Sequence, residues 1–156
     1  MARIEHFHNP NAPKPNSIVV AVTVFVQDGQ GRVLLIQRTD NGLWALPGGA
    51  QDFGEYIAET AVRETREETG IEVEMTGVVG IYTNPNHVVE YSDGEVRQQF
   101  SICFRGRYVS GDPTTSDESS SVRWVAQDQL DHLSIHPSMR LRVDHGFQWR
   151  PEPYVG

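Results

Sequence analysis

The sequence predicts a single α/β domain, and three observations lead to this prediction. Residues Ile18–Val26 are nearly all β-branched or aromatic, which is typical of a strand buried on both faces. A helix with one apolar side follows at about Tyr56–Thr69, and several strand-like segments come after it. With 156 residues, the chain can bury about 70% of the surface that its unfolded form exposes, which suits one domain.

Composition indicates where the domain begins and ends and which classes of partner are excluded. Residues 1–16 hold three prolines and three asparagines without periodicity, so we expect an N-terminal arm, a domain over 17–150 and a tail over 151–156. A formal net charge of −8 argues against a nucleic-acid partner, because a phosphate backbone attracts basic surfaces. The longest apolar run is too short to span a membrane and no signal peptide is evident, so we expect a cytoplasmic protein with no membrane partner.

The remaining elements can be placed in order along the chain. Asp28–Gly31 is a turn that joins the first strand to a second over Arg32–Gln37, which makes a hairpin. Asp93-Gly94 is a further hairpin signal, and the single cysteine, Cys103, lies in an apolar run and reads as a buried side chain. The other predicted strands are Ile71–Tyr82 with a break near Gly77 and Gly80, Gln98–Val109 and Val122–Val125, and further helices are predicted near Gln127–His132 and Pro137–Gly146.

The helix over Tyr56–Thr69 carries the main functional signal. On a helix, Glu64, Glu67 and Glu68 stand at i, i+3 and i+4, so their like charges project from one face and repel each other. A divalent cation with oxygen ligands, such as Mg²⁺, would reverse that repulsion. The alternative is a solvated face with ion pairs between Arg63 and the glutamates Glu59 and Glu67.

The rest of the same stretch predicts how the helix is set in the domain. Ala58, Ala61, Val62 and Thr65 form an apolar stripe that we expect to face the sheet, away from the glutamates. Gly70 is expected to end the helix in the left-handed conformation. Glu55 stands at the helix entrance, where the helix dipole favours negative charge. The preceding loop, 41–49, is rich in glycine, which lets the backbone approach a ligand closely.

These residues resemble the Nudix box, G-x5-E-x7-R-E-U-x-E-E-x-G-U, where U is a bulky aliphatic residue. Gly49, Glu55, Arg63, Glu64, Glu67, Glu68, Gly70 and Ile71 occupy its positions in this sequence. The one departure is Thr65, where the family usually has an aliphatic residue. Because Thr65 falls on the packing side, we expect it to reduce core contact and to leave the chemistry intact.

The resemblance implies a Nudix fold, an α/β/α sandwich with a mixed β-sheet. It also implies hydrolysis, dependent on Mg²⁺ or Mn²⁺, of a nucleoside diphosphate linked to another moiety. By this analogy Glu64, Glu67 and Glu68 hold the metal, together with the backbone carbonyl of Gly48. Arg63 is expected to hold the box glutamates in position.

A further acidic residue is expected outside the box. Nudix proteins often place one in the loop before the last strand, a few residues ahead of a tryptophan. Asp117-Glu118 precede Trp124 in this way, so Glu118 is a candidate metal ligand or general base, with a solvated loop carboxylate as the alternative. Glu67 is the other candidate for the base.

Substrate choice is expected to depend on loops outside the box, chiefly Thr83–Arg97. Some ADP-ribose hydrolases of the family carry a proline about fifteen residues after the box glycine, as Pro85 does here, so ADP-ribose or a nucleotide sugar is favoured. Arg38 is a candidate phosphate contact. Trp44 and Tyr82 are candidates for ligand contact or for core packing, as are His87 and Tyr91.

Other functions stay open at this point. Nucleoside triphosphates, including deoxynucleotides, are the main alternative substrate. A Nudix-fold regulator that binds nucleotides without catalysis is a different class, and such proteins usually have a degraded box, whereas every acidic position is filled here. The expected partner is a small nucleotide, and many relatives form homodimers.

Overall fold

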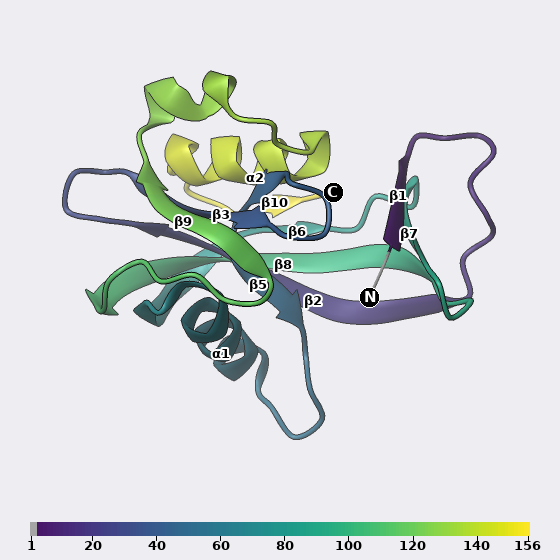
Figure 1. Cartoon of the computed structure of the whole chain (residues 1–156), viewed down its shortest axis with the longest axis horizontal. Helices are drawn as coiled ribbons and strands as arrows, with labels where there is room; N and C mark the ends of the chain where they lie inside the picture. Colours follow the sequence, from purple (N-terminus) through teal and green to yellow (C-terminus); the bar gives the residue numbers. More distant parts are fainter. Residues whose placement is uncertain (1–2) are drawn as a thin grey trace.

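The structure, a computed structural model described over residues 3–156, is built on a mixed β-sheet with helices on both faces (Figure 1). Helix α1 packs on one face and α2 on the other, so the α/β/α sandwich with a mixed sheet is confirmed. The strand order along the main path is β1-β7-β8-β2-β3-β4. The strands are β1 (Arg3–Phe7), β2 (Ser17–Gln27), β3 (Val33–Arg38), β4 (Trp44–Ala45), β5 (Gly48–Ala50), β6 (Glu72–Tyr82), β7 (His87–Tyr91), β8 (Val96–Ser110), β9 (Ser119–Val125) and β10 (Tyr154–Val155). The helices are α1 (Ile57–Thr69), the 3₁₀ helix η1 (Gln127–His132) and α2 (Pro137–Gln148).

Strand β2 is the centre of the sheet. It runs parallel to β8 along its whole length and forms the expected hairpin with β3, where Gln27 is paired with Val33. On the same side it also pairs antiparallel with β5, which brings the box glycines Gly48 and Gly49 against Thr23 and Val22. The glycine loop is therefore fixed to the middle of the sheet.

The core has two halves because β2 is buried on both faces. Its side chains alternate, so that Val22, Val24 and Val26 pack with Ala61 on the α1 side. Phe25 points to the other face and packs against α2 and η1, where the buried residues include Leu130, Val143 and the predicted buried cysteine, Cys103. This burial explains the run of β-branched residues in the sequence.

The two ends of the chain differ from expectation. The segment predicted as an arm without regular structure contains β1, which pairs antiparallel with β7, and the tail contains β10, which pairs parallel with β6. Both strands are short and both pair with residues about 70 to 90 positions away, as Arg3 does with Tyr91 and Tyr154 with Gly80. Local sequence pattern carries no information about such pairings.

Other predicted features are present. The expected breaks in β6 are register shifts against β8, between Met75 and Gly77 and between Val78 and Gly80. Asp93 and Gly94 lie in the turn of the β7–β8 hairpin, so much of the segment predicted as a loop over Thr83–Arg97 is strand.

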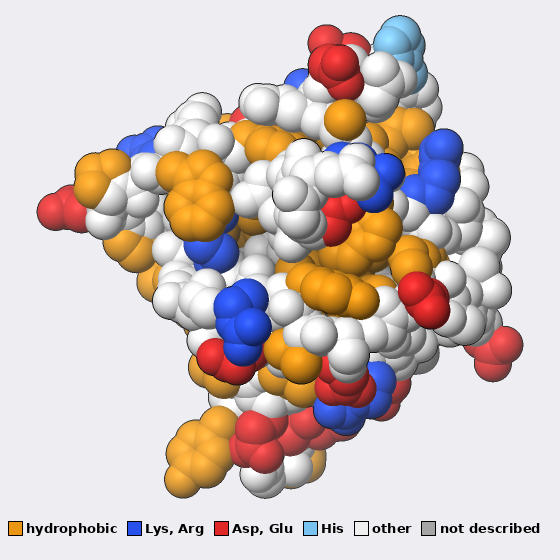
Figure 2. All heavy atoms as spheres, turned by 90° about the vertical axis from the view of Figure 1, so that its left-hand side faces the viewer, with side chains coloured by type: hydrophobic (Ala, Val, Ile, Leu, Met, Phe, Trp, Pro, Cys, Tyr) orange, Lys and Arg blue, Asp and Glu red, His pale blue; other side chains and the backbone are white. Residues whose placement is uncertain are grey.

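None of the helices in the described residues is long and apolar enough to cross a membrane. On the face drawn in Figure 2, hydrophobic side chains occur in separate groups with charged residues of both signs between them.

Candidate active site

A cleft of about 290 Å³ is lined by residues of α1, of the sheet and of the start of α2. Its walls come from β1, β2, β5, β7, β8, the loop before β4, the loop before β9 and the start of α2. Two groups of charged residues line it. We call Glu64, Glu68 and Glu118 the glutamate end, and we call Arg3, Arg97 and Arg142, with Gln99 and Ser101, the arginine end.

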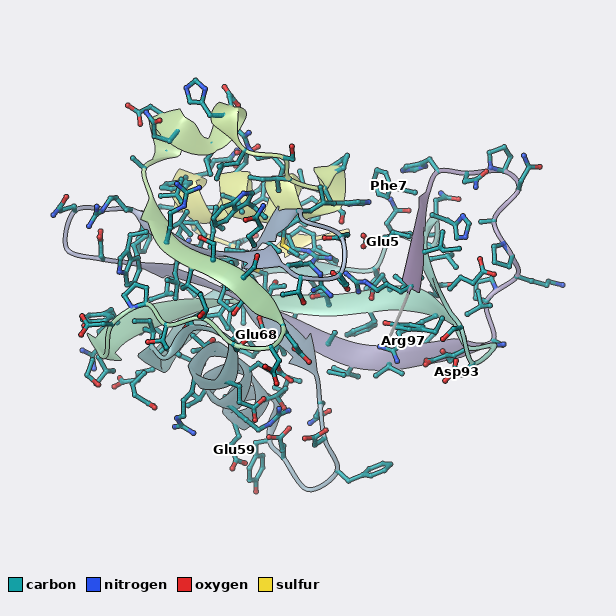
Figure 3. The ribbon with its side chains drawn as sticks, viewed as in Figure 1. Glu5, Phe7, Glu59, Glu68, Asp93 and Arg97 are labelled. Atoms are coloured by element: carbon teal, nitrogen blue, oxygen red, sulfur yellow. The ribbon has the colours of Figure 1, made fainter. Side chains whose placement is uncertain are left out.

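Helix α1 presents its box glutamates unequally. Glu68 is buried, with 5% of its surface exposed, Glu64 is half-buried and Glu67 is exposed. In Figure 3, Glu68 lies between α1 and the sheet, whereas Glu59 points away from both. The expected separation of an apolar face from a glutamate face was therefore wrong in part. Ala61 and Thr65 are buried as expected, but Ala58 is exposed and Glu68 shares the packing side.

The glutamate end brings three carboxylates together. One oxygen from each of Glu64, Glu68 and Glu118 lies within 4.8 Å of the others. Burial, and then the charges of Glu64 and Glu118, raise the pKa of Glu68 to about 9, although the backbone N–H of Gly48 donates to its Oε2 at 3.4 Å. A bound divalent cation would favour the ionised form instead. The oxygen-only donor set fits a hard cation such as Mg²⁺ or Mn²⁺.

The backbone around Glu118 is fixed by hydrogen bonds to the end of α1 and to Thr39. The hydroxyl of Ser119 donates to the backbone carbonyl of Glu68 at 2.7 Å, which ties the loop before β9 to the end of α1. The backbone carbonyl of Glu118 accepts from the N–H of Thr39 at 3.2 Å. The Glu118 side chain itself is exposed, so its carboxylate reaches the cluster from the solvent side of the cleft.

Arg63 connects the helix to the glycine loop. Its Nε and Nη2 donate to the Glu55 carboxylate at 2.7 and 3.0 Å, and Nη2 also donates to the carbonyl of Ala50 at 3.2 Å. Its Nη1 donates to Glu64 at 2.9 Å and to Glu67 at 3.3 Å. The hydrogen bonds from Arg63 and from the Asp52 N–H lower the pKa of Glu55 to about 2. Arg63 is thus placed to hold Glu64 and the loop in one arrangement, while Glu67 lies outside the cluster of three carboxylates.

The predicted ion pair between Glu59 and Arg63 does not form. The carboxylate of Glu59 instead accepts from the backbone N–H of Tyr56 at 2.9 Å, which caps the start of α1. Gly70 ends the helix with φ of 74°, and its N–H donates to the Arg66 carbonyl at 2.9 Å. At the box glycine Gly49, a Cβ would lie 2.5 Å from the Glu64 carboxylate. A side chain at that position would displace Glu64 from the cluster.

The predicted substrate residues have different surroundings. Arg38 lines the cleft, but its Nε and Nη2 donate to the Asp40 carboxylate at 2.9 and 2.7 Å. Trp44 also lines the cleft and belongs to the core, so both of its suggested roles are compatible with its place. Tyr82 lies outside this cleft and lines a neighbouring cavity of about 190 Å³. Pro85 is exposed and lines neither cavity.

Sequence reasoning did not identify the arginine end. Arg97, Gln99 and Ser101 alternate along β8, so they share one face of the strand, and all three line the cleft. Arg142 comes from α2, and its positions i±3 and i±4 hold no acidic residue, which was the one signal available. The β1 residues Arg3 and Glu5 also line the cleft and were assigned to an arm.

The comparisons with known proteins point to one family. The NUDIX domain family matches residues 18–145. A putative 8-oxo-dGTP diphosphatase of Bacillus subtilis is 34% identical over 121 residues, which is 78% of this chain and 74% of that protein. An ADP-ribose pyrophosphatase of Methanocaldococcus jannaschii is 41% identical over 112 residues, 67% of this chain and 60% of that protein. A solved ADP-ribose pyrophosphatase of Streptococcus suis has a TM-score of 0.70 at 20% identity, covers 88% of this chain and 98% of that one, and shares the fold.

Proposed function

The chain belongs to the Nudix hydrolases, and we propose that it cleaves a nucleoside diphosphate linked to another moiety, of the ADP-ribose or nucleotide-sugar type. The observation that carries this proposal is the glutamate end, where Glu64, Glu68 and Glu118 meet in a cleft also lined by Arg38 and Trp44. Nudix hydrolases generally need a divalent metal and act on acid anhydrides of phosphorus.

The three carboxylates of the glutamate end are the proposed metal ligands, with Glu67 and the carbonyl of Gly48 as further ligands. When bound, Mg²⁺ or Mn²⁺ would neutralise phosphate oxygens and lower the pKa of a coordinated water. Glu68 suits this role because a buried carboxylate between two others is stable in its ionised form only beside a cation.

The other residues of the proposed site have distinct roles. Glu118 is exposed at the mouth of the cleft, where its carboxylate can accept a proton from the attacking water if it does not ligate the metal, and Glu67 is the other proposed base. Arg63 positions Glu64 through the hydrogen bonds described above. Arg38 is a proposed phosphate contact, and since Asp40 holds its guanidinium, substrate would have to share or displace that carboxylate.

The choice of substrate rests on two arguments. The relative at 41% identity is called an ADP-ribose pyrophosphatase, and the cleft extends well beyond the glutamate end, which leaves room for a second moiety. The alternative is a nucleoside triphosphate, favoured by the relative called a putative 8-oxo-dGTP diphosphatase. Trp44 is proposed to contact the substrate in the cleft, and Tyr82 and Pro85 remain weaker proposals because they lie outside it.

Product analysis tests the proposal. The protein is incubated with Mg²⁺ and, separately, ADP-ribose, nucleotide sugars, dinucleotides and deoxynucleoside triphosphates, and products are separated by chromatography. Hydrolysis of ADP-ribose adds one water across the P–O–P bond and yields AMP and ribose 5-phosphate, and EDTA should abolish it. Release of pyrophosphate from triphosphates alone would favour the alternative substrate. Absence of turnover on the whole panel would favour a non-catalytic nucleotide-binding protein.

A further inference from the structure

Arg142 is a buried charge, and the carboxylate of Glu5 acts on it from a distance without forming an ion pair. Only 5% of its surface is exposed, and within residues 3–156 its guanidinium forms no ion pair and its Nε has no hydrogen-bond partner. Burial lowers the pKa of this guanidinium, yet arginine remains protonated in proteins. A buried charge that no counter-charge contacts is costly, and proteins generally keep one only where it has a partner. This points to a partner that enters from the cleft.

The protein supports Arg142 from behind. Its guanidinium lies over the ring of Tyr82, 5.1 Å from the ring centre, a cation–π contact that stabilises the charge without using its N–H donors. Tyr82 is itself fixed, since its hydroxyl is 2.8 Å from Nδ1 of His145 and its ring stacks on Tyr154 at 5.1 Å. Arg142 is therefore held in place while its donors stay free.

The cavities around Arg142 are lined with further donors. Arg142 lines both the main cleft and the neighbouring cavity of about 190 Å³, and Gln99 lines both as well. The hydroxyl of Ser101, on the same face of β8, is also buried without a hydrogen-bond partner and lines the main cleft. Three side chains able to donate hydrogen bonds thus line this space, and among residues 3–156 Arg142 Nε and Ser101 Oγ have no hydrogen-bond partner there.

A cation is a poorer occupant of this region than an anion. Glu5, His87 and His136 place ligand atoms within 4.8 Å of one another, an arrangement that alone would suit a transition metal. However, Glu5 already accepts from Nε2 of His87 at 3.0 Å. Burial, and then the neighbouring charges of His87, Arg142 and Arg3, lower the pKa of His136, against the opposing effect of Glu5. A dication at this point would face two guanidinium groups.

We propose that Arg142, with Gln99 and Ser101, binds a phosphate monoester carried by the second moiety of the substrate. The proposal rests on the proposed function and narrows it. The substrate class is then a nucleoside diphosphate whose diphosphate lies at the glutamate end and whose second moiety carries a further phosphate at the arginine end. Arginine suits this role because its planar donors match two phosphate oxygens at once.

Binding without divalent metal isolates the arginine end, because the carboxylates of the glutamate end then repel anions. Isothermal titration with ribose 5-phosphate in EDTA should detect binding to the whole protein, with ribose as the uncharged comparison. Arg142→Met should weaken the binding of ribose 5-phosphate by about tenfold or more. The matched control is Arg105→Met, an equal change of charge at a half-buried arginine outside the cleft, which should change it by less than about twofold.

Two further variants separate folding and catalysis from phosphate binding. Ser101→Ala removes a hydroxyl that has no hydrogen-bond partner among the described residues, so the variant should keep the native fold. It should weaken the binding of ribose 5-phosphate about threefold. This result tests the proposal even where Arg142→Met does not fold. Glu68→Gln should abolish hydrolysis and keep the binding of ribose 5-phosphate. Phosphate binding at the arginine end is thus measured independently of hydrolysis, so the two proposals can fail separately.

Three outcomes would overturn the proposal. One is equal affinity for ribose and ribose 5-phosphate. Another is equal weakening by Arg142→Met and Arg105→Met in proteins with native circular dichroism. The last is the absence of phosphate binding together with Zn²⁺ binding that His136→Ala removes, which would assign the region to a cation.

Discussion

The two ends of the cleft are opposites in charge and in origin. The glutamate end takes Glu64 and Glu68 from one helix and adds Glu118 from one loop, whereas the arginine end takes its side chains from β1, β8 and α2. Each end holds a buried ionisable side chain that forms no ion pair within the described residues, Glu68 in one case and Arg142 in the other. From this difference we infer that the glutamate end needs a cation, and the arginine end an anion, to balance its buried group.

The two ends also differ in how they are held. At the glutamate end, Arg63 fixes Glu64 through a set of hydrogen bonds that includes Glu55 and Ala50. At the arginine end, Arg142 is supported by the ring of Tyr82, and no hydrogen bond orients its Nε. The Glu64 carboxylate is therefore oriented by directional hydrogen bonds, whereas the Arg142 guanidinium is supported by a contact with a ring face.

The largest effect is expected from Glu68→Gln. Loss of one buried charge from the glutamate end should reduce kcat for pyrophosphate hydrolysis by about 1,000-fold, since a bound metal contributes several kcal/mol of charge stabilisation. Steady-state kinetics with Mg²⁺ measures it. The matched control is Glu59→Gln on the opposite side of α1, which should keep activity within about twofold. Equal rates for the two variants would contradict the metal assignment of Glu68.

A smaller loss is expected from Arg63→Ala. Because Arg63 is a positioning residue, its removal should lower kcat by about 10- to 100-fold and weaken the activation by Mg²⁺ to a similar extent. Titration of the rate against Mg²⁺ concentration measures both effects. Arg63→Lys restores the charge without the paired donors to Glu55, so only partial recovery is expected. Full recovery would mean that charge alone matters at this position.

Arg142→Met should change KM and leave kcat nearly unchanged. For ADP-ribose with a phosphate on its terminal ribose, KM should rise about tenfold while kcat changes by less than about twofold. For ADP-ribose itself both constants should stay within about threefold, because this substrate places no phosphate at the arginine end. A fall in kcat with both substrates would break the division of the cleft into two independent ends.

The smallest effect is expected from Glu5→Gln, on how the free energy of unfolding depends on pH. Burial alone would raise the pKa of Glu5, but the hydrogen bond from His87 and the charge of Arg3 outweigh it and lower the pKa to about 2. A lowered pKa stabilises the folded protein above the unfolded value of about 4.5, and this contribution is lost as the pH falls toward 2. Urea unfolding should therefore show Glu5→Gln less stable by about 1–3 kcal/mol at pH 7, with a gap that closes near pH 2.

The control for this measurement is Glu74→Gln. Glu74 is exposed and pairs with Arg107 on the surface, so its removal should cost less than about 0.5 kcal/mol at either pH. A gap between wild type and Glu5→Gln that stayed constant from pH 7 to pH 2 would show that the contribution of Glu5 does not come from its charge.

The sequence predicted the glutamate end far better than the arginine end, and locality is the reason. Glu64 and Glu68 are four residues apart on one helix, so helical periodicity alone places them together. Glu118 needed the family resemblance. Arg3 and Arg142 are 139 positions apart, and no periodic pattern links them. Their meeting depends on the pairing of β1 with β7 and on where α2 lies on the sheet.

The fold shows the same dependence on locality. The buried strands, the box helix with its Gly70 cap and the breaks in β6 all follow from neighbouring residues. The short strands β1 and β10 are defined by distant partners and were missed. The burial of Glu68 was also missed, because a charged residue on the packing side of a helix contradicts the ordinary amphipathic pattern. Such a conflict between local rule and structure is typical of a functional site.

The register shifts of β6 have a consequence for the behaviour of the protein at high concentration. On the side of β6 away from β8, β10 is the one strand that pairs with β6 within residues 3–156, and it covers Gly80 and Ile81, so in this part of the chain most of β6 is an open sheet edge. A straight open edge is a template for pairing with a second copy, whereas bulges bend and twist the strand and interrupt the row of donors and acceptors. We therefore expect the irregularities of β6 to disfavour edge-to-edge pairing of two copies.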